Sequence, residues 1–286
     1  MKISSIYKEK KTVFSLEVFP PKKTSSEDTI YSTLDGLRSL SPDFISVTYG
    51  AGGNVADNKT RRIAEIIKKE YGIESMAHLT CVSTGADDAA LIVRDLDTAG
   101  IENILALRGD VNPERPPKND FRYASDLVSF IAERGDFDIG GACYPEGHSE
   151  SSSLDADIDN LKKKVDAGVT FLISQLFFDN AFFFDFTERA MRKGIDVPVS
   201  AGIMPVTNKN QIERMVTMCG ASIPADLAKL MSKYADDPAA LSDAGIEYAS
   251  RQIEGLISGG VRGIHIYTMN SPGIALAIYD RIKSLL

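Results

Sequence analysis

Residues 75–110 have the sequence SMAHLTCVSTGADDAALIVRDLDTAGIENILALRGD, which contains one complete copy of the pattern that sets the fold. A short apolar run, Ser75–Val82, is followed by an amphipathic stretch, Asp87–Ala99, that stops at Gly100. A second apolar run, Asn103–Gly109, comes next. Short apolar runs between turn residues are typical of buried strands, and glycine just after a periodic stretch commonly ends a helix. The stretch therefore predicts strand, helix and strand, the unit from which parallel sheets are built.

The same alternation continues in both directions along the chain. Strands are predicted at Val13–Phe19, Phe44–Tyr49, Ser75–Val82, Asn103–Gly109, Ile139–Pro145, Phe171–Phe178, Val197–Met204 and Gly263–Met269. Helices are predicted between them at Ser25–Leu40, Lys59–Tyr71, Asp87–Ala99, Tyr123–Arg134, Leu154–Ala167 and Ala181–Lys193. Eight such units without a long interruption favour a single α/β domain over residues 1–286, closed as a (β/α)8 (TIM) barrel.

Two details refine this fold. An open doubly wound sheet would usually carry GxGxxG after its first strand, whereas residues 19–23 here are Phe-Pro-Pro-Lys-Lys. Before the last strand the pattern gives three helical stretches where one suffices, at Asn208–Cys219, Pro224–Tyr234 and Ala239–Ser258. Extra helices are therefore expected before the eighth strand.

Charge and composition exclude several classes of protein. The 286 residues include 32 Lys and Arg against 40 Asp and Glu, so the formal net charge is −8. This argues against a nucleic-acid partner or an anionic membrane surface, which need a clustered positive field. No apolar run is long enough to span a bilayer, and no signal-peptide core is present. The three cysteines are far apart and odd in number, so they predict neither a disulfide framework nor a metal site, and a cytoplasmic location is expected.

Glu17 is the sharpest single candidate for chemistry. Strand alternation places it on the face opposite Leu16 and Val18. A carboxyl group in so apolar a run is expected to have a raised pKa and to be suited to general acid catalysis. The alternative is a buried structural ion pair with Arg108 or His78.

Two further patterns are open to two interpretations. In Arg108-Gly109-Asp110 the glycine lets the backbone approach a planar ligand, or the turn is an ordinary one with Asp110 as the next helix N-cap. On the helix Leu154–Ala167, Asp157, Asn160 and Lys164 follow one stripe. An acid, an amide and an ammonium in a row suit a ribose and a phosphate, or they form a solvated face.

The strand ends carry a set of motifs in a fixed order. They are Leu16-Glu17-Val18-Phe19-Pro20-Pro21, Ser46-Val47-Thr48-Tyr49-Gly50, His78-Leu79-Thr80-Cys81, Leu107-Arg108-Gly109-Asp110, Tyr123-Ala124-Ser125-Asp126-Leu127, Tyr144-Pro145-Glu146-Gly147-His148, Lys164-Val165-Asp166-Ala167-Gly168, Gln175-Leu176-Phe177-Phe178-Asp179, Gly202-Ile203-Met204-Pro205-Val206 and Tyr267-Thr268-Met269-Asn270. Ten motifs in register over essentially the whole chain resemble the methylenetetrahydrofolate reductase family.

The resemblance implies a barrel that binds FAD non-covalently at the strand ends. It implies a ping-pong reaction in which NADH or NADPH reduces the flavin and methylenetetrahydrofolate is then reduced to 5-methyltetrahydrofolate. By this resemblance Glu17 is the general acid, Asp110 lies near the flavin's pyrimidine side, and Gln175 binds the pterin. It also implies a bacterial-type enzyme without the C-terminal regulatory domain, and a homo-oligomer.

The flavin-contacting positions follow from the same resemblance. They are Thr48, Tyr49, Ala51, His78, Arg108, Gly109, Asp110, Tyr123, Ala124, Tyr144 and His148, with Asp157, Asn160, Lys163 and Lys164 at the ribityl and phosphate part. Thr48 is also a substrate-side position.

Two substrate-side positions depart from the family's pattern. The family often places an aromatic residue where Lys209 stands and an arginine where Ser271 stands. Direct reduction by NADH or NADPH therefore has an alternative, in which a partner subunit or a low-potential electron carrier donates the electrons. Two further alternatives are a flavin-binding subunit of a larger one-carbon complex and a non-flavin barrel enzyme such as a pterin methyltransferase or an aldolase. The predicted strands contain no lysine of the kind an aldolase needs.

Overall fold

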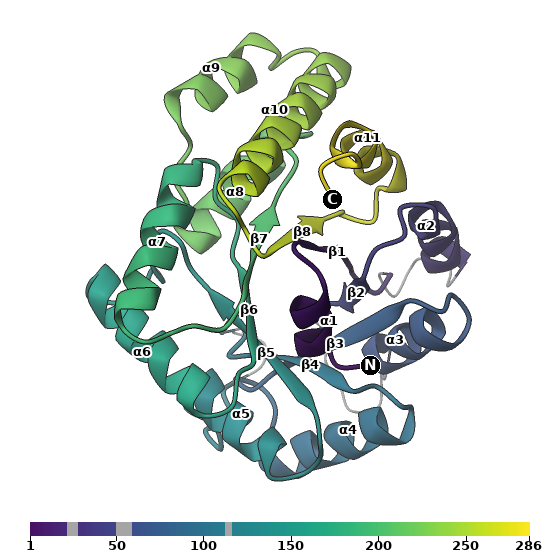
Figure 1. The fold of residues 1–286 in the computed structure, drawn as a ribbon, viewed down its shortest axis with the longest axis vertical. Coiled ribbons are helices and arrows are strands. Elements are labelled where there is room, and N and C mark those ends of the chain that lie inside the picture. Colours follow the sequence, from purple (N-terminus) through teal and green to yellow (C-terminus); the bar gives the residue numbers. More distant parts are fainter. Residues whose placement is uncertain (22–27, 50–58, 112–115) are drawn as a thin grey trace.

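The computed structural model describes residues 1–21, 28–49, 59–111 and 116–286, and it confirms the barrel. Eight parallel strands pair in sequence order, and β8 pairs with β1 to close the sheet (Figure 1). The strands are β1 (Val13–Val18), β2 (Phe44–Val47), β3 (Glu74–Thr80), β4 (Asn103–Leu107), β5 (Asp138–Cys143), β6 (Phe171–Ser174), β7 (Val199–Ile203) and β8 (Gly263–Tyr267).

Helices surround the barrel, as Figure 1 shows. They are α1 (Ile3–Glu9), α2 (Asp28–Arg38), α3 (Lys59–Lys69), α4 (Ala86–Thr98), α5 (Ala124–Ala132), α6 (Leu154–Asp166), α7 (Asn180–Arg192), α8 (Lys209–Cys219), α9 (Ala225–Lys233), α10 (Pro238–Ser258) and α11 (Pro272–Ile282). In the described part of the chain, no helix is both long and apolar enough to cross a bilayer. All the helices predicted from the sequence are present, and the extra helices before β8 are confirmed as α8, α9 and α10.

Alternation along β1 separates two packing environments. Leu16 and Val18 point outward into the main core between the barrel and its helices. Val13 points inward and joins a second core inside the barrel. Ser15 is buried and Glu17 only slightly exposed, and both contact inward-facing residues of β8. The predicted faces of β1 are therefore confirmed.

The N-terminal helix α1 closes one end of the barrel and was not predicted. Its Ile3, Ile6 and Tyr7 pack against inward-facing strand residues such as Phe44 and Phe171. The Tyr7 hydroxyl lies 2.6 Å from Ser200 Oγ, inside the barrel. This end is filled with side chains, so an open cavity has to lie at the other end.

The extra helices build a third core beside the strand ends. Met204 and Val206, which follow β7, pack with Ile212 of α8, Leu227 of α9 and Leu241 of α10. A Cβ at Gly245 of α10 would lie 1.8 Å from the carbonyl oxygen of Val206, so this helix touches the chain there.

Several strands end earlier than predicted. The run Phe171–Phe178 leaves the sheet after Ser174. The carbonyl of Phe177 accepts from Gln252 Nε2 at 2.9 Å, and that of Phe178 accepts from the Tyr248 hydroxyl at 2.7 Å. These backbone groups bond to α10 instead of a strand, so Gln175 lies just after β6 rather than within it.

Candidate active site

A cavity of about 940 Å³ opens at the carboxyl ends of the strands. The predicted positions that line it are Thr48, Tyr49, His78, Arg108, Gly109, Asp110, Tyr123, Ala124, Tyr144, His148, Asp157, Asn160, Lys163, Lys164 and Gln175. They come from five strand ends and from α5 and α6, so the fold gathers segments far apart in the sequence. This size is at the upper end of the range for small-molecule sites.

Four predicted positions are not among the lining residues. Ala51 lies outside the described residues. Lys209 is the first residue of α8, and its Nζ lies 3.9 Å from Glu213. Ser271 precedes α11 and makes no side-chain cap. Glu17 lies just below the cavity, in contact with the lining residue His78.

Two histidines and a serine surround the Glu17 carboxylate. Its Oε2 lies 3.5 Å from His78 Nε2, 3.6 Å from His265 Nε2 and 3.4 Å from Ser46 Oγ, which donates to it. Of the two ion-pair partners expected for Glu17, His78 is in contact and Arg108 is not, because Arg108 pairs with Glu150; burial keeps His78 neutral near pH 7, so its contact with Glu17 is not an ion pair there.

The prediction of a raised pKa for Glu17 is wrong. Burial is the largest influence and raises it, as expected. Contact with His265, the electrostatic influence of His78 and His265, and the Ser46 hydrogen bond together outweigh burial, and the net pKa of Glu17 is lowered. The sequence predicted a raised pKa because it showed the apolar neighbours along β1 but not the polar groups across the barrel.

The two histidines beside Glu17 differ in their other contacts. His265 Nδ1 lies 2.8 Å from Ser15 Oγ, whose hydroxyl donates to Ile264 O at 3.3 Å. The Nε2 atom of His265 faces the carboxylate and has no hydrogen-bond partner among the described residues. Burial lowers the pKa of His78 to about 4, although the charge of Glu17 opposes this. His78 is therefore neutral at pH 7, and the Nε2 atoms of His78 and His265 both lie within 4 Å of the Glu17 carboxylate.

The Arg108-Gly109-Asp110 turn is part of the cavity wall. Asp110 is not a helix N-cap, because α5 begins at Ala124 with Tyr123 before it. Gly109 has φ +81°, and a Cβ there would lie 2.9 Å from Thr80 Cβ. Glycine is therefore required by the backbone conformation and by packing on the end of β3.

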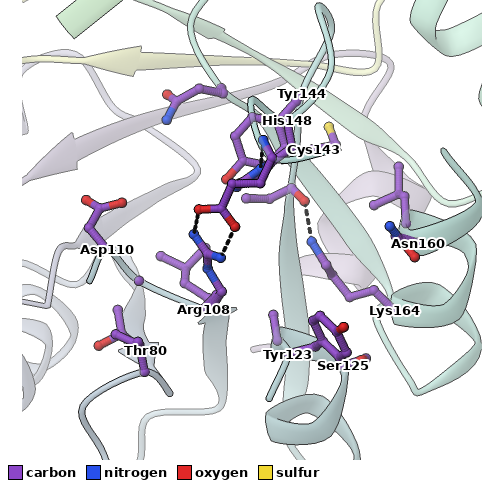
Figure 2. Close-up of a pocket in the computed structure, with 18 of the residues that line it drawn as sticks. Thr80, Arg108, Asp110, Tyr123, Ser125, Cys143, Tyr144, His148, Asn160 and Lys164 are labelled. Atoms are coloured by element: carbon purple, nitrogen blue, oxygen red, sulfur yellow. Dashed lines mark hydrogen bonds and ion pairs between the residues drawn. The ribbon is translucent and has the colours of Figure 1, made fainter. Parts of the chain in front are cut away.

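The α6 stripe faces the cavity. Lys164 Nζ donates to the carbonyl of Ala142 at 2.7 Å and forms no salt bridge with the described residues. Burial lowers the pKa of Lys164, and nearby Cys143 and Asp157 only partly oppose this. Figure 2 shows Lys164 and Asn160 on this helix, directed toward the space that Arg108 and Tyr144 also border. Asp157, Asn160 and Lys164 all line the cavity, as the ligand-binding interpretation expects, while Asn160 is exposed and accepts from Lys163 Nζ at 3.0 Å, as the solvated-face alternative expects.

Glu150 is the main residue that sequence reasoning missed. Its carboxylate binds Arg108 with both oxygens, at 2.5 Å to Nη1 and 2.9 Å to Nη2. It lies in the loop before α6, where no periodicity marks a residue. Other unpredicted lining residues include Thr80, Thr84, Ser125, Cys143 and Ser151.

Comparison with known proteins agrees with this geometry. The family model "Methylenetetrahydrofolate reductase" matches residues 2–283. The chain belongs to the methylenetetrahydrofolate reductase family. It is 40% identical over 264 residues to 5,10-methylenetetrahydrofolate reductases of Pectobacterium carotovorum and Escherichia coli, covering 92% of this chain and 88% of theirs. An Arabidopsis thaliana relative, "Methylenetetrahydrofolate reductase (NADH) 1", is 34% identical, and the match covers 49% of its length.

A solved structure has the same fold. A Clostridium thermocellum protein described as binding two copies of 5-methyl-5,6,7,8-tetrahydrofolic acid superposes with a TM-score of 0.72 at 14% identity, over 98% of this chain and 97% of its own. At that identity the likeness shows the fold alone. The family match shows that this reductase is an oxidoreductase acting on methylenetetrahydrofolate, which answers the methyltransferase and aldolase alternatives.

Proposed function

We propose that this reductase binds FAD in the cavity and converts methylenetetrahydrofolate to 5-methyltetrahydrofolate in a ping-pong reaction with NADH or NADPH as donor. The observation that carries the proposal is the partly buried ammonium of Lys164. It faces the cavity with a backbone carbonyl as partner and no salt bridge among the described residues. A buried cation without a balancing charge is costly, and an anionic phosphate would supply that charge.

The rest of the lining also suits a flavin nucleotide. Asp157 and Asn160 lie on the same helix as Lys164 and offer groups that bind hydroxyls. Tyr144 and His148 form an edge-to-face pair, with ring centroids 4.7 Å apart, that gives the cavity an aromatic border. We assign the phosphate and ribityl part to α6 and the ring system to the side of Arg108, Gly109 and Asp110.

FAD, when bound, supplies a two-electron carrier that serves the two substrates in turn. The protein's own residues supply binding, orientation and protons. Glu17 holds a proton for the folate nitrogen, so that the methylene bridge opens. The net pKa of Glu17 is lowered in the protein without ligands, so Glu17 has to gain its proton when a substrate covers the cavity, excludes water and strengthens the effect of burial. Asp110 places a negative charge beside the cavity, and Gln175 offers an amide to the pterin.

An anaerobic two-step titration tests the proposal. NADH or NADPH is added to the purified protein loaded with FAD, and the visible absorbance of the flavin should bleach. Methylenetetrahydrofolate is then added, and the absorbance should return. Absence of flavin binding, or no return with folate after chemical reduction, would overturn the proposal.

A different electron donor is the second candidate. The positions of Lys209 and Ser271 at helix starts outside the cavity lining favour it, because neither offers a stacking ring or a guanidinium to a substrate. In that case neither nicotinamide bleaches the flavin, while chemically reduced protein still reacts with folate. A partner subunit or a low-potential carrier would then be sought as donor.

A further inference from the structure

Asn270 ties the end of β8 to the segment after β1. Its Nδ2 donates to Phe19 O at 2.8 Å, and its Oδ1 accepts from Phe19 N at 3.0 Å. Phe19 lies directly after β1 and follows Glu17 by two positions. One carboxamide thus satisfies both backbone groups of a single residue, as a neighbouring strand would.

A second route joins Asn270 to Glu17 itself. The backbone N–H of Asn270 donates to Thr268 Oγ1 at 3.1 Å. The Thr268 hydroxyl donates in turn to the carbonyl of Glu17 at 2.6 Å. Thr268 is buried, so this short chain of hydrogen bonds is shielded from water. The backbone of Glu17 is fixed at its own carbonyl and again at Phe19.

The sequence after β1 makes such a tie necessary. Pro20 and Pro21 have no N–H group, so neither can donate a hydrogen bond to a neighbouring strand. Phe19 is the last residue before them that can be held in this way. Without the Asn270 side chain, the chain would be free to fray beyond Val18, whose carbonyl accepts from Thr48 N at 3.0 Å.

The backbone at Asn270 adds an independent observation. Met269 and Asn270 have φ values of 51° and 54°, so two successive residues other than glycine are left-handed. Such conformations cost roughly 1–3 kcal/mol each and persist where the surrounding contacts fix them, often at functional sites. Glycine would fit more easily, but glycine has no carboxamide.

We propose that Asn270 is a positioning residue for Glu17, holding the end of β1 so that the carboxyl group meets His265 and the substrate in one fixed geometry. This rests on the proposed function, because the position of Glu17 matters for the rate only if Glu17 delivers a proton. A misplacement of about 1 Å can cost on the order of a hundredfold in rate.

Two variants and one matched control test this role. Asn270→Gly keeps the left-handed backbone and removes the carboxamide, whereas Asn270→Asp keeps an acceptor and loses the donor to Phe19. Asn103 is the control, because at the opposite end of the barrel its Oδ1 accepts from Ile3 N at 3.0 Å and its Nδ2 donates to Met1 O at 3.1 Å. Asn103→Ala therefore removes a similar tie far from the cavity.

The two half-reactions are measured separately in the FAD-loaded protein. Both Asn270 variants should slow flavin reoxidation by methylenetetrahydrofolate by about ten- to a hundredfold. Flavin reduction by the nicotinamide or by a chemical reductant should stay within twofold, and the pH dependence of reoxidation should shift. Asn103→Ala should lower the melting temperature and leave both rates near those of the native protein. Equal losses in both half-reactions, or reoxidation unchanged in Asn270→Gly, would overturn the proposal.

Two further measurements separate the possible failures. Amide hydrogen exchange at Phe19 in the protein without cofactor should be faster in Asn270→Gly and unchanged in Asn103→Ala, and protection equal to native would count against the tie. Glu17→Gln is measured alongside. If Glu17→Gln leaves reoxidation unchanged, the proposed role of Glu17 fails first. If flavin reoxidation is slow in Glu17→Gln and as fast as native in Asn270→Gly, only the positioning role of Asn270 fails.

Discussion

Three side chains beneath the cavity form one small electrostatic system. Glu17 faces His78 and His265, and all three are largely buried. A proton gained by one of them alters the charge that the other two experience at less than 4 Å. The same groups therefore control both acid stability and the proposed proton delivery.

His78 should make the protein sensitive to acid. Its folded pKa is about 4 against an ordinary value of 6.5. Between these values the unfolded chain binds a proton that the folded protein does not, so stability is lost as pH falls from about 6.5 to about 4. The loss is on the order of 3 kcal/mol. In His78→Gln the free energy of unfolding in urea should differ less between pH 7.5 and pH 5 than it does in the native protein. An equal pH dependence of the free energy of unfolding in the variant and the native protein would mean that His78 is already charged in the folded protein at pH 5.

Lys164 should affect FAD binding much more than folding. Lys164→Met removes the charge proposed to meet the phosphates, and FAD should bind roughly ten- to a hundredfold more weakly in a fluorescence titration. The protein without FAD should be at least as stable in urea, because burial already disfavours the ammonium. Lys162→Met is the control, since Lys162 on the same helix pairs with Asp166. Native FAD affinity in Lys164→Met would rule out the phosphate assignment.

Single residues also show how far sequence reasoning reaches into the site. The strand ends were predictable to within a few residues because apolar runs stop near them, and in a barrel those ends converge. Glu150 was not predictable, since its importance comes from Arg108, which is distant in sequence and close only after folding. The predicted direction of the Glu17 pKa shift was wrong for the same reason, because His78 and His265 belong to other strands.

At the level of elements, the helices missed from the sequence are those whose ends are fixed from elsewhere. Lys2, before α1, makes no side-chain cap. The first N–H groups of α1 are bound instead by Asn103 Oδ1 at 3.0 Å and Asp138 Oδ2 at 2.6 Å, from β4 and β5. The helix α11 likewise begins at Pro272 without a side-chain cap. Capping patterns therefore mark neither α1 nor α11, whereas α6 and α8 carry their own N-cap side chains. The helices α4 and α9 lack such a cap and were predicted from their apolar periodicity.

The contact of α10 with the chain after β7 gives the element-scale prediction. Gly245→Ala would place a Cβ 1.8 Å from Val206 O, so the helix or the chain leading to α8 must move. We expect a loss of about 1–3 kcal/mol in urea unfolding, with a higher KM for folate because the wall beside the strand ends shifts. Gly273→Ala in α11 is the control, because no atom of the described residues lies within 4 Å of its Cβ. It should gain up to about 1 kcal/mol from helix propensity. Equal stability of the two variants would contradict this packing.

Across the whole molecule, stability and chemistry lie at opposite ends of the barrel. The inside of the barrel is packed with Phe44, Phe171 and the side chains of α1 at one end. The other end leaves about 940 Å³ open for ligands. Residues near the cavity, such as Lys164 and His78, are buried at a cost to folding, so the closed end has to supply stability in compensation.

Ile3 allows this division to be tested. It is fully buried between α1 and the strands, at the end away from the cavity. Ile3→Ala should cost about 2–5 kcal/mol in urea unfolding and Ile3→Val about 0.5–1.5 kcal/mol, because the lost methyl groups leave a cavity. Both variants should keep FAD affinity and both half-reaction rates within twofold, measured below the onset of unfolding. If the rates fell in proportion to stability, the closed end would also shape the cavity. The positions of Glu17 and His265 would then depend on packing along the whole length of β1 and β8.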